Sequence, residues 1–521
     1  MSLVQNAAGR WVPSDVNGRR AEPYRGVGKY VPEGRKAAPP IRSCASFPPN
    51  GNKVAPGLQE ALRRAGLRDG TVISSHHHLR DGDELAAQVF ALVAELGVRD
   101  VVWLPSAAFP CHGALIPHLE SGILHHVEGS LNGPLGEYAS RGKMRGMAVM
   151  RSHGGRYRAI QDGEVKIDIA VVAAPAADAF GNCSGVDGPS ACGPLGFALA
   201  DVQYAEHVIA VTDHLVPFPC VPWHIPGNLV DQVVVIDRLG DPSRIVSGTT
   251  EITRSPDRLL IAEYTARLVR DAGIMKPAFS FQAGAGGVSL AFTIFLRDFM
   301  REAGVRARFI RGGSTKYLVE MLESGLADYI LDGQCFDLEG VRSLRRNPAH
   351  VPTSPFHSYN YHGKGNVASM LDCVVLGATE VDLEFNANVV THSDGRLLHG
   401  IGGWQDALFS RCTILTVPSF RGRVPILRDR VTTLCGPGEL IDAVVTERGV
   451  AINPRRHDLL AALKGSDLPL RSLADLKAEA ESICGGAPAP APVTERPIGV
   501  VTWVDGTVLD TIYGVEFPEA P

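Results

Sequence analysis

Short apolar runs alternate with amphipathic stretches of helical period along most of the chain. This alternation is typical of βαβ units that build a mainly parallel sheet. Two helices are clearly marked. The first spans 84–96 and stops at Gly97; the second spans 289–303, with Ser289 as N-cap and Gly304 as the stop. Both helices are predicted to cover a sheet with their apolar faces.

The two helices occupy matching places in a long internal repeat. Three pairs of segments match: 71–105 with 278–312, 167–182 with 371–386, and 193–197 with 400–404. The first pair reads strand, loop, helix, glycine, strand in both copies. Because the repeat unit is far longer than a solenoid unit, it predicts an α/β fold with two similar domains and mainly parallel open sheets.

The repeat predicts a first domain over 58–255 and a second over 256–485. Residues 1–57 are rich in Pro, Gly, Arg and Lys without a sustained period, so we expect an irregular N-terminal arm. This arm lies on the main body or on a partner, unless it is disordered. The composition of 486–521 predicts a linker and then a C-terminal hairpin around Asp505 and Gly506.

Composition narrows the function classes. The formal net charge of -5 and the pI of about 6.4 give no electrostatic footprint for nucleic acid. No apolar run reaches the roughly 20 residues of a membrane span, and the N-terminus has no signal-peptide pattern, so a cytoplasmic location is expected. The 10 cysteines are scattered, which argues against a disulfide framework and a zinc site. A sugar-responsive regulator would need a helix-turn-helix, and the arm lacks the period for one.

The repeat also isolates one acidic residue. Each copy follows a hydrophobic strand with an Asp and, four residues later, an Asn that we expect to shape a turn. Two residues before that Asp, the first copy has Ala176 and the second has Glu380. A carboxylate after a parallel strand lies where open α/β sheets place active sites. Glu380 is therefore the candidate catalytic carboxylate, and a surface or salt-bridged Glu is the alternative.

Glycine loops of the second copy supply candidate binding groups. In the loop 399–404, Gly402 and Gly403 are candidates for backbone N–H donors to an oxyanion. The loop after the strand ending near 282 leads into a helix, a context that fits anion binding. We predict that it cradles a thioester carrier together with the glycines of 311–315. The candidate carrier-binding residues are Gln282, Gly284, Gly286, Gly287, Gly312 and Gly313.

The first copy carries polar loops instead. Three consecutive histidines and an arginine occupy 76–80, and a further histidine lies in 152–156. Consecutive residues point in different directions and no carboxylate spacing accompanies them, which argues against a metal. A cationic arginine with neutral histidine donors suits a polycarboxylate. The candidate substrate-binding residues are His77, Arg80 and His153.

Several long motifs occur in an order and spacing similar to those of the citrate lyase α subunit, a family with CoA-transferase-type domains. They include ISSHHHLRDGDELA, FSFQAGAGGVSLAF, GATEVDLEFNANVV and GIGGWQDA. The resemblance covers nearly the whole chain. It implies that acetate is exchanged for citrate on the thioester of an acyl carrier with a CoA-like prosthetic group, without a metal.

The resemblance also implies an oligomeric assembly with a β subunit and an acyl carrier γ subunit. By the same resemblance, Glu380 aligns with the motif that carries the nucleophile of related acetate-using CoA-transferases. Gly402 and Gly403 align with the oxyanion loop of those enzymes. Citrate lyase-type exchange is thought to pass directly through a mixed anhydride, in which case Glu380 acts electrostatically or by positioning. A transferase that uses free acyl-CoA with citramalate, malonate or acetate is the alternative.

Overall fold

The computed structural model describes residues 2–33, 49–246, 251–284, 286–361 and 366–517. Its first large sheet has six parallel strands in the order β14-β12-β9-β5-β6-β7. The strands are β5 (Val72–Ser75), β6 (Val101–Pro105), β7 (Leu124–Val127), β9 (Ile169–Ala173), β12 (His207–Thr212) and β14 (Gln232–Val235). Their buried, β-branched runs are typical of a parallel sheet covered on both faces.

The second large sheet has the order β18-β17-β16-β15-β19-β22-β26-β27. Its strands are β15 (Ser280–Ala283), β16 (Phe309–Ser314), β17 (Ile330–Cys335), β18 (His350–Pro352), β19 (Cys373–Gly377), β22 (Thr413–Thr416), β26 (Ala443–Thr446) and β27 (Gly449–Ile452). Only the β26–β27 pair is antiparallel in this sheet. Strands β17 to β26 repeat the order of the first sheet, so the predicted class of two similar open-sheet domains is confirmed. The domain bounds stay a prediction.

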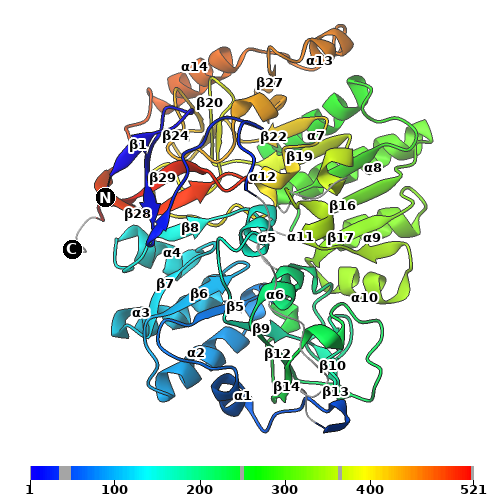
Figure 1. The fold of residues 1–521 in the computed structure, drawn as a ribbon. Coiled ribbons are helices and arrows are strands. Elements are labelled where there is room, and N and C mark those ends of the chain that lie inside the picture. Colours follow the sequence, from blue (N-terminus) through cyan, green and yellow to red (C-terminus); the bar gives the residue numbers. More distant parts are fainter. Residues whose placement is uncertain (1, 34–48, 247–250, 285, 362–365, 518–521) are drawn as a thin grey trace.

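Helices cover the two sheets, which Figure 1 shows in the lower half and at the upper right. They are α1 (Leu58–Arg64), α2 (Leu85–Glu95), α3 (Ile116–Ser121), α4 (Gly133–Ser140), α5 (His153–Gln161), α6 (Leu199–Tyr204), α7 (Pro256–Asp271), α8 (Gly287–Ala303), α9 (Lys316–Glu323), α10 (Leu338–Arg346), α11 (Pro355–Ser358), α12 (Trp404–Ala407), α13 (His457–Ala462) and α14 (Leu473–Cys484). Helices α2 and α8 confirm the two predicted helices. The predicted cap Ser289 is wrong, because α8 begins two residues earlier and Gly286 occupies the N-cap.

Two small ladders repeat the same design beside the large sheets. In the first, β10 (Ala176–Asp178) pairs with β11 (Cys183–Ser184) and β13 (Leu215–Val216). In the second, β20 (Glu380–Asp382) pairs with β21 (Ala387–Asn388) and β25 (Leu427–Arg428). The turn prediction is confirmed: the backbone N–H of Asn182 donates to Asp178 at 3.1 Å, and that of Asn386 to Asp382 at 3.0 Å.

Residues 2–33 of the N-terminal arm and the C-terminal hairpin lie together at the left of Figure 1. The hairpin strands β28 (Val493–Thr502) and β29 (Val508–Val515) confirm the predicted turn and extend the first domain's β8 (Ala148–Met150). The described part of the arm is less irregular than expected, because it forms short strands against the hairpin. These are β1 (Leu3–Gln5), β2 (Trp11–Pro13), β3 (Asp15–Val16) and β4 (Arg19–Arg20). Outside the arm, a further short pair is formed by β23 (Phe420–Arg421) and β24 (Val424–Pro425) in the second domain.

The largest hydrophobic cluster continues from the first domain into the second, joining for example Trp103, Leu195, Val381 and Trp404. A second cluster lies within the second domain and contains Phe281 and Phe292. The junction between the domains is therefore packed like a core, which holds the loops between them in fixed positions. No helix in the described ranges is long and apolar enough to cross a bilayer.

Candidate functional site

The glycine loops of the two copies pack reciprocally across the domain junction. A Cβ added at Gly400 would lie 1.9 Å from the Cβ of Ser130, which follows β7. A Cβ added at Gly193 would lie 2.7 Å from the sulfur of Cys335, the last residue of β17. Because β7 and β17 are equivalent strands, the glycine loop of each domain packs against the end of the same strand in the other domain. Only glycine permits this approach.

The loop 400–404 reaches helix α5 of the first domain. The backbone N–H of His153 donates to the carbonyl of Gly402 at 2.8 Å. Gly402 has φ 61°, and a Cβ there would lie 3.8 Å from Nε2 of His153. A Cβ on Gly403 would lie 2.9 Å from the Tyr359 hydroxyl. The predicted residues His153, Gly402 and Gly403 thus lie together.

Asp406 ties the two domains together one turn further on. Its Oδ1 accepts from the Ser152 hydroxyl at 2.8 Å, and its Oδ2 from the Gly154 N–H at 3.1 Å. Ser152 is also the N-cap of α5 and accepts from the Gly155 N–H. Burial raises the pKa of Asp406 to about 7. The start of α5, including His153, is therefore held against α12 by a carboxyl group of the second domain.

His77 lies at the same junction and bridges the domains. Its Nδ1 is 2.6 Å from the Ser106 hydroxyl, and its Nε2 is 3.1 Å from Oε1 of Gln334 on β17. Its ring stacks on His153, with centroids 5.3 Å apart, and packs on Phe197 at 4.7 Å. Burial lowers the pKa of His77 well below its usual value and that of His153 to about 3. Both imidazoles are neutral at physiological pH.

Arg80 contributes a cation from the first domain. Its Cζ lies 4.4 Å from the centroid of Phe336 of the second domain and 5.2 Å from that of Phe109. A Cβ on Gly313 would meet the Phe336 ring at 1.9 Å, so Gly313 and Arg80 pack on the same aromatic ring. Burial lowers the pKa of Arg80 to about 10, which still leaves it charged at neutral pH.

Gln282 and Arg311 face this junction from the second sheet. They are register partners on the parallel strands β15 and β16, so their side chains leave the same face of the sheet. The Gln282 amide bonds the hydroxyl of Tyr359, and Arg311 lies over the Tyr359 ring, with Cζ 4.7 Å from its centroid. Gly312 has φ 132°, and a Cβ there would lie 2.3 Å from the Ala283 carbonyl oxygen.

The loop before α8 was predicted to bind an anionic or thioester group, and this remains a prediction. Gly286 has φ 151°, and a Cβ there would meet no atom of the described residues within 4 Å. Within the described ranges no side chain caps the first N–H groups of α8, and its first turn has no acidic residue. Gly284 and Gly287 approach backbone more closely, with added Cβ atoms 3.2 Å from the Val375 oxygen and 2.8 Å from the Thr253 nitrogen. Uncapped backbone N–H groups beside open space are suited to binding an anionic group.

Glu380 has a different setting from the residues above. Its side chain is 0% exposed, and Oε1 lies 3.0 Å from Nη2 of Arg428. Oε2 accepts from the Thr432 N–H at 2.8 Å and from Nδ2 of Asn388 at 3.1 Å. These partners all belong to the second domain, and the salt-bridged alternative describes the geometry of Glu380.

The neighbouring histidines of the first domain form no metal cluster in the described ranges, where no group of three or more His, Cys, Asp and Glu side chains is arranged to hold an ion. The ring of His76 has no hydrogen-bond partner among described residues, and neither has that of His78. Burial lowers the pKa of His76 to about 4 and that of His78 well below its usual value. Both rings are therefore neutral at physiological pH.

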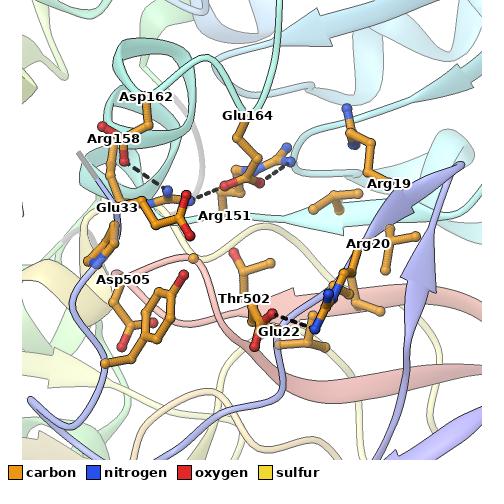
Figure 2. Close-up of a pocket in the computed structure, with 18 of the residues that line it drawn as sticks. Arg19, Arg20, Glu22, Glu33, Arg151, Arg158, Asp162, Glu164, Thr502 and Asp505 are labelled. Atoms are coloured by element: carbon orange, nitrogen blue, oxygen red, sulfur yellow. Dashed lines mark hydrogen bonds and ion pairs between the residues drawn. The ribbon is translucent and has the colours of Figure 1, made fainter. Parts of the chain in front are cut away.

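A cavity of about 250 Å³ lies elsewhere, among the arm, the C-terminal hairpin and the far end of α5. Figure 2 shows that charged side chains line it. Four arginines and five carboxylates do so. Several of them form ion pairs: Arg158 lies 3.2 Å from Asp162, and Arg151 lies 3.1 Å from Glu164. This charged cavity lies between the arm and the rest of the protein, and none of the predicted site residues lines it.

Sequence reasoning missed three residues of the junction. Tyr359 lies outside the three pairs of segments matched in the repeat, so that comparison did not mark it. Asp406 directly follows the glycine loop, and its proximity to the predicted Gly403 was the available signal. Gln334 lies near the end of β17, but only the fold brings it to His77.

Two equivalent open sheets with glycine loops exchanged across a packed junction define a duplicated α/β protein of the CoA-transferase-like class. A Pseudomonas malonate decarboxylase hetero-tetramer solved with malonate shares this fold, with a TM-score of 0.58 at 19% identity over 84% of each chain.

The family model for the citrate lyase alpha subunit matches residues 51–515, and the chain belongs to this family. The citrate lyase alpha chain of Klebsiella pneumoniae is 41% identical over 88% of this chain and 91% of its own length. A Streptococcus mutans structure described as the alpha subunit of citrate lyase in complex with citrate has a TM-score of 0.93 at 37% identity, covering 98% of this chain and all of its own.

Proposed function

We propose that the protein exchanges acetate for citrate on the thioester of an acyl carrier, the first half-reaction of citrate lyase. The supporting observation is that one junction, in a chain of this family, combines the cations Arg80 and Arg311, the neutral imidazoles His77 and His153, and the Gly402–Gly403 loop. Cations and neutral donors bind a polycarboxylate, while a glycine loop leaves room for a reacting carbonyl.

The exchange balances without an oxidant, a metal or a net proton. The bond between the carrier sulfur and the acetyl carbon breaks, and a bond between the same sulfur and a citryl carbon forms. One carboxylate oxygen of citrate leaves with the acetate. Because each step develops negative charge on a carbonyl oxygen, the main task of the protein is to hold the two acyl groups together and to stabilise that charge.

The residues of this chain divide that task. The N–H groups of Gly402 and Gly403 serve the oxyanion, and His77, Arg80 and His153 hold the acid. Gln282, Gly284, Gly286 and Gly287 receive the CoA-like prosthetic group of the carrier, with Gly312 and Gly313 beside them. The open space at Gly286 and the uncapped start of α8 fit such a group. That group supplies the thiol that carries the acyl chain.

Glu380 acts as a positioning residue in this proposal. A nucleophile must reach the reacting carbonyl, whereas the Glu380 carboxylate is buried and accepts from Thr432 and Asn388 while paired with Arg428. The pairing holds strand β25 and the turn after it beside β20. A direct exchange through a mixed anhydride needs no enzyme-bound acyl group and agrees with this setting.

The partners follow from the reaction. The acyl carrier is a small γ subunit, and a separate β subunit cleaves the citryl thioester, so the chain works within an oligomeric complex. The test uses the purified chain with acetylated carrier and measures acetate release on addition of citrate, citramalate or malonate. Citrate should exceed the other acids by at least about 10-fold. No release with citrate would overturn the proposal, and equal activity with acetyl-CoA would favour the free-CoA alternative.

A further inference from the structure

The Arg311 guanidinium is buried and forms no ion pair with an acid of the described residues. Its side chain belongs to the largest fully buried ones, and its Nε and Nη1 atoms have no hydrogen-bond partner in the described part of the chain. Its guanidinium lies over the Tyr359 ring and thus keeps one face covered. A desolvated cation left without an anion strongly destabilises a fold, so a ligand that supplies the anion is the physical reason to retain one.

Two other buried arginines do not share this state. Arg156 forms a bidentate pair with Asp201, at 2.8 and 2.6 Å, and Arg428 pairs with Glu380. The acid that acts electrostatically on Arg311 is Asp406, which is already bonded to Ser152 and Gly154. Burial raises the pKa of Asp406 to about 7, so it is substantially protonated at neutral pH and neutralises Arg311 only in part.

The register partner of Arg311 adds a complementary group. Gln282 lies beside it on β15, and its Oε1 is buried without a hydrogen-bond donor among the described residues. Its amide is oriented by the bond to the Tyr359 hydroxyl. Side by side, the two residues therefore present unused cationic donors and an unused acceptor. A molecule that carries both a carboxylate and a hydroxyl group matches this pair.

We propose that Arg311 binds a carboxylate of the incoming acid and that Gln282 accepts a hydrogen bond from that acid's hydroxyl group. This inference rests on the proposed function and deepens it, because it names hydroxylated polycarboxylates as the substrate class. It also moves Gln282 from the carrier site, where the glycine pattern put it, to the acid site. Arg80 and the neutral histidines then contact the remaining carboxylates.

The test compares Arg311→Met with Arg308→Met, which removes an exposed cation from the approach to the same strand. Titration calorimetry measures citrate binding, and thermal unfolding measures the ligand-free proteins. Arg311→Met should weaken citrate binding by at least about 30-fold, the loss of a charge-assisted pair. Its ligand-free unfolding temperature should equal or exceed that of the wild type, since an uncompensated buried charge is gone. Arg308→Met should bind citrate normally.

A purely structural Arg311 predicts the opposite pattern, namely lower stability with unchanged citrate affinity, and that result would overturn the inference. So would equal losses of citrate and CoA affinity, which would mark a phosphate site. A second variant, Gln282→Met, should bind citrate and its deoxy analogue tricarballylate equally, while the wild type prefers citrate. Retained preference would remove the Gln282 role.

Binding and turnover separate the two proposals. If the wild type binds citrate through Arg311 but releases no acetate from the carrier, the transfer proposal fails and the acid site stands. If Arg311→Met keeps the wild-type KM for citrate in acetate release, the acid site fails and the transfer proposal stands. Absence of binding by citrate, citramalate and tricarballylate to the wild type would refute the acid site outright.

Discussion

The backbone N–H of His153 donates to the Gly402 carbonyl at 2.8 Å across the domain junction. This bond sets the first turn of α5 against the glycine loop before α12, and Asp406 reinforces it through the Gly154 N–H. The neutral ring of His153 and the loop N–H groups are thereby fixed relative to each other before any substrate arrives. Such preorganisation is what stabilisation of a developing oxyanion requires.

Gly402 allows a matched test of the loop. Gly402→Ala places a methyl group at φ 61° and 3.8 Å from Nε2 of His153, which strains the backbone without a clash. Gly304→Ala places one at φ 63° with nothing within 4 Å, at the end of α8. Each should lose about 1–2 kcal/mol of unfolding free energy. Acetate release should fall at least about 10-fold in Gly402→Ala alone, because the methyl group occupies the reacting space.

Urea denaturation and carrier-dependent acetate release measure the two quantities. If both alanine variants lose activity in proportion to their stability, the loop is only a tight turn. If Gly402→Ala keeps full turnover, the reacting carbonyl lies elsewhere.

Glu380 and its ion pair give a second prediction. Glu380→Gln leaves Arg428 without its anion and should lower turnover by at least roughly 100-fold while the fold survives. Glu384→Gln, on the exposed part of the same turn, is the control and should be near normal. A positioning role further predicts that Arg428→Met loses activity to a similar extent, since either change breaks the pair.

Steady-state turnover and intact-protein mass after exposure to acetylated carrier distinguish the roles. Near-normal turnover in Glu380→Gln would leave this residue a bystander. A mass increase at Glu380 in the wild type would instead identify it as the nucleophile and refute positioning.

The repeat in the sequence accounts for most of the correct predictions. Equivalent strands end at the same edge of their sheets. His77 follows β5, and Gln282 and Gly312 lie near the ends of β15 and β16, so these residues were expected to converge if the two domains faced each other. The glycines of the exchanged loops were recognisable because close backbone approach restricts those positions to glycine.

The remaining features depend on tertiary packing that no local pattern encodes. Glu380 lies on a short ladder outside the main sheet, so its orientation is decided by β25 and the Thr432 turn. Whether Arg311 has an ion-pair partner depends on which acidic side chains the tertiary packing places beside it, and this cannot be read from the sequence. Ser289 illustrates the same limit at a helix end: the sequence marked it as the N-cap, whereas α8 begins at Gly287 after the N-cap Gly286.

Asp406 predicts a pH dependence of stability. Its pKa is raised from 3.8 to about 7 by burial, so between pH 4 and pH 7 the folded protein holds a proton that the unfolded chain has released. Its contribution to the unfolding free energy is therefore present at low pH and is lost as pH rises through this window, by an amount on the order of a few kcal/mol. Asp406→Asn removes that contribution.

Urea denaturation of both proteins at several pH values between 4 and 8 checks the sign. The buried histidines make the opposite contribution, because the unfolded chain protonates them at acidic pH while the folded protein does not. They are common to both proteins and cancel in the difference. The unfolding free energy of the wild type relative to Asp406→Asn should fall as pH rises; a flat or rising difference contradicts the assignment.

The N-terminal arm should be held by Asn6. Its Nδ2 donates to the carbonyls of Val508 and Leu509 at 3.1 and 2.8 Å, and its Oδ1 accepts from the N–H groups of Ala8 and Arg10. Asn6→Ala removes these four hydrogen bonds, at a cost of about 1–3 kcal/mol that falls on the arm–hairpin contact. Limited proteolysis should cut the arm of Asn6→Ala at least about 5-fold faster, the change expected for roughly 1 kcal/mol of local opening.

The control is Asn52→Ala at an exposed position, and this variant should be cut at the wild-type rate. Unchanged proteolysis in Asn6→Ala would mean that the other arm contacts, such as the bond between Tyr24 N–H and the Val508 carbonyl, hold the arm without it.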